Sequence, residues 1–111
     1  MSKLTKEATI ILALSEIEKE LKNLNLWSDA ENRPADEAFL SQTPFFMDTM
    51  EFHQWLQFVL IPKMIELVNS RAPLPKNVSI HPYAQEIYRG KWQEYKLLIQ
   101  KLMEFDKLFK S

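Results

Sequence analysis

Two segments, one near each end of the chain, carry hydrophobic residues at spacings of three and four. In the first segment these are Ile10, Leu14, Ile17, Leu21 and Leu24. In the last they are Tyr95, Leu98, Ile99, Leu102, Phe105 and Phe109. This spacing places each set on one face of an α-helix, with polar residues on the other faces. The pattern predicts two long amphipathic helices, the first capped by Thr5 or Ser2.

The segment from Met50 to about Asn69 is different, because its apolar residues occupy most of a helical circumference. Such a pattern predicts a buried helix covered by the other elements. Pro62 lacks a backbone N–H and its ring clashes with the carbonyl of Phe58, so it predicts a kink or break. Asp48 and Glu51 resemble a capping box at the start of this helix.

All six prolines lie between residues 34 and 82, which leaves both terminal segments free to be helical. Residues 71–82 are expected to form an extended connector. Pro82 suits the start of a short helix, Tyr83 to Arg89, capped by His81 or Ser79. Gly90 suits a left-handed C-cap or a hinge before the last helix. We therefore predict an all-α fold, a single-domain four-helix bundle over residues 1–111, with a kinked, buried central helix and proline-rich connectors.

Composition excludes several classes of chemistry. The 111 residues contain no cysteine and one glycine, which excludes thiolate metal sites, a cysteine nucleophile and glycine-rich phosphate loops. The two histidines, His53 and His81, are too few and too far apart for a metal site. No catalytic set is apparent, so we expect no catalytic residues, no metal and no cofactor, and a protein that is not an enzyme.

Charge is close to balanced, at −1 overall, but its distribution is uneven. Residues 28–51 contain six acidic residues and only Arg33 as a basic one, whereas residues 89–111 contain six basic residues and three acidic ones. We expect these two groups to face each other or to be solvated. An alternative is contact with tRNA through Lys96, Lys107 and Lys110. Neither DNA nor a membrane is an expected partner, because no apolar run is long enough to span a bilayer and the net charge is near zero.

Aromatic residues are concentrated around the predicted start of the central helix. Phe45 and Phe46 are adjacent and cannot easily both point inward, so one is expected to line a groove or a partner surface. The candidate binding surface consists of Phe45, Phe46, Asp48, Glu51, Trp55, Gln57 and Tyr83. We interpret it as the surface of a non-enzymatic interaction module that binds an unidentified protein. The alternative is a small-ligand-binding protein or an enzyme with a pocket between helices, opened at Pro62 and lined by Trp55, Gln57 and Tyr83.

The stretch from Pro44 to Pro62, PFFMDTMEFHQWLQFVLIP, resembles the hallmark segment of the YqcC-like family of small bacterial proteins. Pro73-Leu74-Pro75, Pro82-Tyr83 and the terminal Phe105 to Phe109 are similar to further landmarks of that family. The resemblance implies an all-α, four-helix domain in a bacterial cytoplasm.

Members of the YqcC-like family are associated by name with tRNA pseudouridine synthase C. Enzymes of that class use a catalytic aspartate in an arginine-leucine-aspartate context, on a sheet-based domain. Here the three arginines are followed by Pro34, Ala72 and Gly90. The sequence therefore does not predict pseudouridine synthase activity, and leaves an accessory role in tRNA modification as the hypothesis.

Overall fold

The computed structural model describes residues 5–109, and all regular structure within that range is helical. The α-helices are α1 (Lys6–Asn23), α2 (Phe52–Trp55), α3 (Ile61–Asn69), α4 (His81–Ile87) and α5 (Trp92–Lys107). Thr5 caps α1, because its hydroxyl oxygen accepts a hydrogen bond from the backbone N–H of Ala8 at 3.0 Å. The alternative cap, Ser2, lies outside the described residues. The predicted all-α fold is confirmed.

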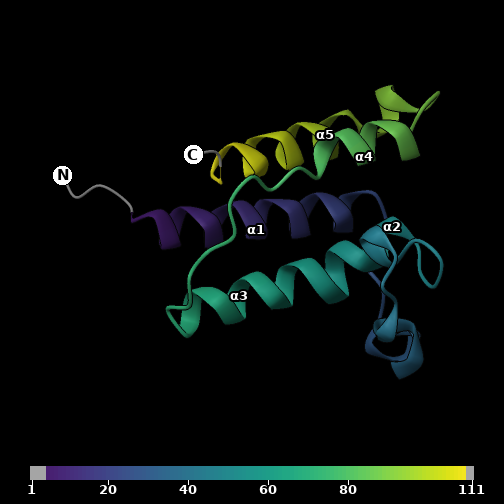
Figure 1. Cartoon of the computed structure of the whole chain (residues 1–111). Helices are drawn as coiled ribbons and strands as arrows, with labels where there is room; N and C mark the ends of the chain where they lie inside the picture. Colours follow the sequence, from purple (N-terminus) through teal and green to yellow (C-terminus); the bar gives the residue numbers. More distant parts are fainter. Residues whose placement is uncertain (1–4, 110–111) are drawn as a thin grey trace.

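Helix α1 lies between α3 on one side and the pair α4 and α5 on the other (Figure 1). Its predicted stripe, from Ile10 to Leu21, is buried against the stripe of α5, which includes Leu98 and Phe105. Complete burial of one such aliphatic side chain contributes about 1.5–3 kcal/mol. The spatially central helix is therefore α1, and not the strongly apolar segment that the sequence suggested.

Helices α2 and α3 form one continuous helix through a π-helical turn, Leu56–Leu60. The backbone N–H of Ile61 donates to the carbonyl of Leu56, five residues earlier. This wider turn comes immediately before Pro62, which cannot donate a backbone hydrogen bond. The distortion that Pro62 predicts is therefore present, as a π turn.

The start of α2 differs from the expectation for Asp48. Helix α2 begins after Glu51, which forms a capping box with Gln54, and the backbone N–H of Glu51 donates to Gln54 Oε1 at 2.8 Å. Asp48 instead accepts a hydrogen bond from the Ser41 hydroxyl at 2.5 Å. It lies too early in the chain to serve as the cap, because three residues separate it from the first helical position.

Helix α4 is capped from another part of the molecule. Neither His81 nor Ser79 caps it through a side chain; α4 begins at His81, and Ile80 occupies the N-cap position. Asp106 Oδ2, on α5, accepts hydrogen bonds from the backbone N–H groups of Ile80 at 2.7 Å and His81 at 2.9 Å. The same oxygen is 2.7 Å from His81 Nδ1. Asp106 is only 2% exposed, so this carboxylate fixes the start of α4 against α5 from inside the core.

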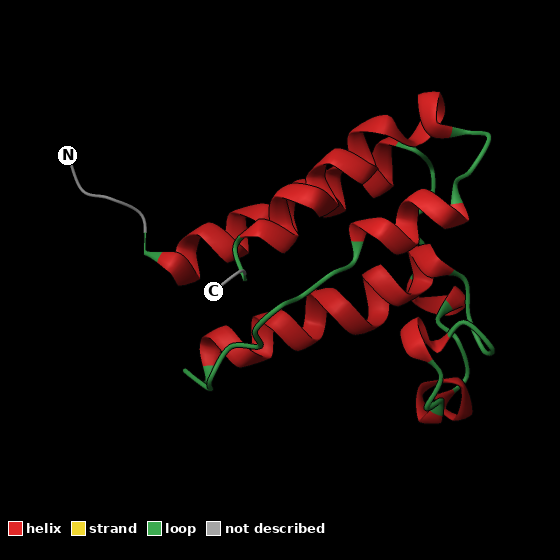
Figure 2. Ribbon diagram, turned by 45° about the horizontal axis from the view of Figure 1, so that its top comes forward, coloured by secondary structure: helices red, strands yellow, loops and turns green. Residues whose placement is uncertain are grey.

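Gly90 lies between α4 and α5 with a φ of +85°. The predicted left-handed glycine after the short helix is confirmed. In Figure 2 the connector from α3 to α4 is extended, and the three 3₁₀ turns Ala30–Asn32, Asp36–Leu40 and Pro44–Phe46 lie together beside α2. Within residues 5–109, none of the helices is both long enough and apolar enough to cross a membrane.

Candidate functional site

Phe45 and Phe46 adopt consecutive left-handed conformations, with φ values of +57° and +52°. This backbone region is unfavourable for bulky side chains and costs on the order of 1–3 kcal/mol per residue. Phe45 lies on one side of the strained turn, stacked on Tyr83 with ring centres 4.3 Å apart. Phe46 lies along a groove on the outer surface. The two adjacent rings are thus used differently, one for packing and one at a surface.

The ring of Phe45 belongs to an aromatic cluster that joins three elements. It packs edge-on against Trp55 of α2 at 4.9 Å, and Tyr83 of α4 packs edge-on against Phe52 at 5.3 Å. Partial burial, together with the negative charge of Glu51, raises the pKa of Tyr83 above its ordinary value. The structure therefore brings Phe45, Trp55 and Tyr83 together, but as a clamp that attaches the 44–46 turn to α2 and α4.

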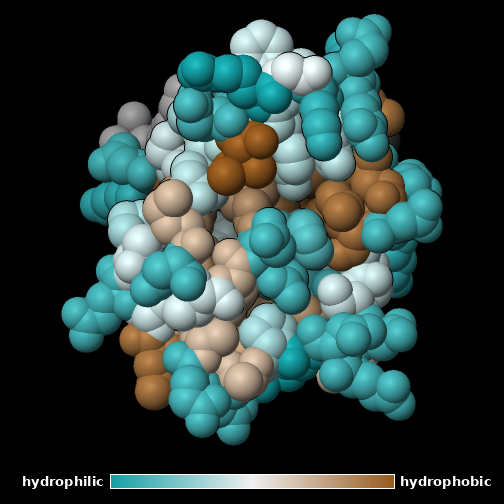
Figure 3. Space-filling model, turned by 90° about the vertical axis from the view of Figure 1, so that its right-hand side faces the viewer, coloured by the Kyte–Doolittle hydropathy of each residue, from teal (hydrophilic) through white to brown (hydrophobic). Residues whose placement is uncertain are grey.

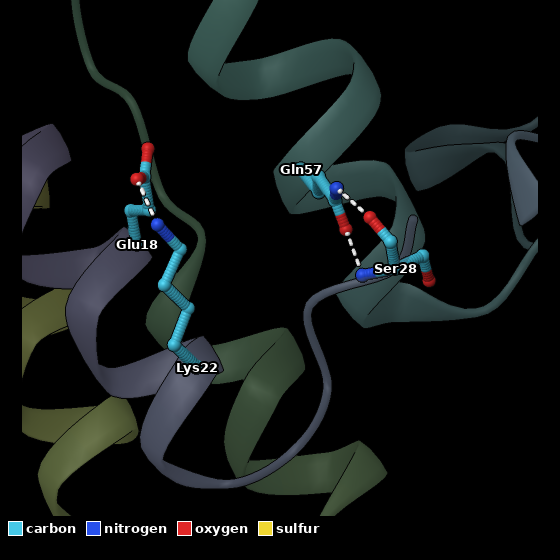
Figure 4. Close-up of polar contacts among 4 residues, drawn as sticks. All are labelled: Glu18, Lys22, Ser28 and Gln57. Carbon is cyan, nitrogen blue, oxygen red and sulfur yellow. Dashed lines mark hydrogen bonds and ion pairs between the residues drawn. The ribbon is translucent and has the colours of Figure 1, made fainter. Parts of the chain in front are cut away.

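Gln57, which the sequence assigned to the candidate binding surface, is only 8% exposed. Its side-chain amide donates to the carbonyl of Ser28 and accepts from the N–H of Ser28, each at 2.8 Å (Figure 4). These two bonds attach the chain that leaves α1 to the π turn. The amide of Gln57 is bonded to Ser28, and the rings of Trp55 and Tyr83 contact other rings. These three side chains therefore stabilise the fold.

The candidate surface that remains is a groove of about 290 Å³ on the outer side of the π turn and α3. It is lined by Phe39, Phe46, Phe58, Val59, Pro62, Lys63 and Glu66. We call this the outer groove. Leu40 and Met47, which follow Phe39 and Phe46 in sequence, are 77% and 56% exposed. The apolar helix is thus covered on one side only, and the expectation that other elements surround it is wrong.

Acidic residues accompany the outer groove. Within residues 5–109, no ion pair joins the acidic segment 28–51 to the basic segment that begins at Arg89. Arg33 pairs with Asp36 at 3.0 Å and also stacks on the ring of Phe39, 4.2 Å from its centre. The hydrogen bond from Ser41 lowers the pKa of Asp48, which keeps that carboxylate ionised. Among the described residues, the acidic segment is therefore not paired with the basic segment. The three 3₁₀ turns lie within the acidic segment.

The two histidines lie in separate places. His81 is bound to Asp106, whereas His53, on α2, is half-buried and its burial lowers its pKa. In the part of the chain that the structure describes, no group of three or more His, Cys, Asp and Glu side chains is arranged to hold a metal ion.

Some residues of the outer groove were not identified from the sequence. Phe39 stands in a polar segment, and Phe58 and Val59 lie within a run that is apolar on all sides. The spacing of Phe58, Val59 and Pro62 shows that they share a helical face, but not that this face is uncovered.

Comparison with known proteins identifies the family. The family model described as "DUF446: tRNA pseudouridine synthase C" matches residues 9–108. An uncharacterized protein of Haemophilus influenzae is 38% identical over 95 residues, which cover 86% of this chain and 87% of the relative. The uncharacterized protein YqcC of Escherichia coli is 35% identical over 106 residues, covering 96% and 95%. A protein of Pectobacterium carotovorum named tRNA pseudouridine synthase C is 35% identical over 74 residues, covering 67% of this chain and 19% of that protein.

A solved structure gives the same result. The solution NMR structure of YqcC from E. coli aligns with a TM-score of 0.84 at 34% identity, over 96% of this chain and 89% of that one. The fold and the sequence thus agree over nearly the whole length. The chain belongs to the DUF446 family, whose members include YqcC of E. coli.

Proposed function

We propose that this protein is a non-enzymatic interaction module that binds a tRNA pseudouridine synthase in the bacterial cytoplasm. The observation that carries the proposal is the outer groove, where Phe58 and Val59 remain accessible on a helix whose opposite side is buried, with Phe46 of the neighbouring 3₁₀ turn beside them. A soluble protein gains stability by covering such a face, and leaving it open is typical of a partner-binding surface.

The partner is suggested by the Pectobacterium relative. The residues similar to this chain make up 19% of that protein, so most of its length lies outside the similarity. We infer that in the relative the module is joined to the synthase in one polypeptide. Where the module is a separate chain, the outer groove would replace that covalent link with a non-covalent one.

The chemistry of the groove also limits what the partner presents. Aromatic and aliphatic side chains form most of its lining, together with Lys63 and Glu66, and two of the lining rings, Phe39 and Phe46, belong to the acidic segment 28–51. The surface that would match this groove is an apolar segment flanked by lysine or arginine. Its apolar side chains would pack on the groove, and its basic side chains would complement the acidic segment.

Isothermal titration calorimetry between this protein and the tRNA pseudouridine synthase C of the same bacterium tests the proposal. A buried aromatic residue at the centre of an interface contributes about 2 kcal/mol, so Phe46→Ala should weaken binding by about 30-fold. The substitution keeps a Cβ at the left-handed position, so the backbone is under the same constraint as before. Circular dichroism checks that the variant is folded.

The control is Leu97→Ala, which removes an exposed apolar side chain from α5, away from the groove. It should leave the affinity unchanged. Absence of binding by the unmodified protein would exclude this partner, and equal affinities for the Phe46→Ala and unmodified proteins would exclude the groove.

A further inference from the structure

A second surface lies at the junction of α4 and α5 and does not involve the outer groove. Trp92, the first residue of α5, is 54% exposed. Its indole Nε1–H donates to the backbone carbonyl of Gln85 at 2.8 Å. This bond fixes the orientation of the ring, while about half of the residue stays exposed to solvent.

Trp92 is one wall of a hollow of about 210 Å³ that is also lined by Gln85, Lys96 and Ile99. Trp92, Lys96 and Ile99 stand at positions i, i+4 and i+7 and therefore share one side of α5. Gln85 closes the hollow from α4. Figure 3 shows the end of the molecule that includes the α4–α5 junction, where hydrophobic groups are separated by hydrophilic ones. The ring of Trp92 thus lies beside the polar side chain of Gln85 and the cationic side chain of Lys96.

The charges around the hollow favour an anion. Lys91 and Lys96 form no ion pair within the described residues, whereas the carboxylate of Glu86 is held by Arg89 at 2.6 Å. Glu94 is the acidic residue in the first turn of α5. Residues 85–96, which carry the α4–α5 junction, contain three basic groups, Arg89, Lys91 and Lys96, and two acidic ones, Glu86 and Glu94.

The geometry points to a nucleotide-binding site, in which a base stacks on the open face of Trp92 and its phosphate contacts Lys96. An indole face stacks on any base, and lysine supplies the phosphate contact without reading sequence. A hollow of this size takes a single base. The site stands apart from the aromatic cluster around Phe45, whose rings contact each other and leave no open face between them.

Fluorescence anisotropy at low salt tests this site with three probes: a fluorescein-labelled unstructured 12-nucleotide RNA, DNA of the same sequence, and labelled AMP. Trp92→Ala should weaken binding by about 10-fold or more, because base stacking on one aromatic ring accounts for such a factor. Trp92→Phe should retain most of the affinity. Lys96→Gln should reduce the slope of log affinity against log salt by about 0.7, as expected for one phosphate contact to a single strand.

Two control variants define the outcome. Lys63→Gln, beside the outer groove, should leave the salt slope unchanged, and Phe46→Ala should leave the affinity unchanged. Equal binding of AMP and the strands would identify a free nucleotide as the ligand, and binding of the strands alone would identify nucleic acid. Failure of all three probes to bind, or full affinity in Trp92→Ala, overturns the proposal without affecting the outer groove.

Discussion

Helix α1 and the continuous helix formed by α2 and α3 differ in how their surroundings use their apolar residues. The modest stripe of α1 is completely buried, because α5 covers one side of it and α3 the other (Figure 1). The richer apolar surface of α2 and α3 is buried on the inner side and open along the outer groove. Apolar content alone therefore does not determine which helix is central. A helix with more apolar surface than its neighbours can cover has a face available for another molecule.

The largest expected effect tests this difference directly. Leu14→Ala, at a fully packed position of α1, should lower the free energy of unfolding by about 2–5 kcal/mol, because it removes buried methyl groups and leaves a cavity. Val59→Ala, on the outer groove, should lower it by about 1 kcal/mol or less, since solvent already reaches that side chain. Urea denaturation of both variants measures the difference. Similar losses would show that the outer side of α2 and α3 is packed as tightly as α1.

The second prediction concerns Asp106, whose carboxylate fixes the start of α4 against α5. Asp106→Ala removes the acceptor for the N–H groups of Ile80 and His81 and leaves both without a partner near the core. We expect a loss of about 2–3 kcal/mol, because hydrogen bonds to a charged group are strong and unpaired buried donors are costly.

Glu104→Ala is the matched control, two residues earlier on the same helix and exposed. It should change stability by less than about 0.5 kcal/mol. A small loss in Asp106→Ala, comparable with the control, would mean that water or Ser79 replaces the carboxylate as the cap.

The sequence was sufficient for features that depend on local spacing. The stripes of α1 and α5, the distortion before Pro62 and the left-handed Gly90 each follow from the order of residues within one or two turns. The sequence did not reveal that Asp106 caps α4, because the bonded groups are 26 residues apart and no periodic pattern connects them.

The candidate site was predictable to a similar degree. Because Phe45 and Phe46 are adjacent, the sequence predicted that their side chains point in different directions. Their left-handed backbone conformations decide which of the two reaches the surface. Gln57 was assigned to the candidate binding surface, yet it is buried, and its two hydrogen bonds to Ser28 satisfy its amide there. The exposure of Trp92 depends on how α4 meets α5, which is a tertiary property.

The smallest expected effect concerns Gly90, at the junction that positions Trp92. A Cβ at this residue would meet no atom within 4 Å, so space is not the constraint. The φ of +85° is the constraint, because L-residues with a side chain are strained there. Gly90→Ala should therefore destabilise the protein by about 1 kcal/mol, measured by thermal and urea denaturation.

Gly90→Asn is the matched control and should lose less stability, since asparagine tolerates a left-handed backbone better than alanine. Equal stability of the Gly90→Ala and unmodified proteins would mean that α4 and α5 can join through a right-handed turn, and the orientation of Trp92 would then depend on its bond to Gln85 alone.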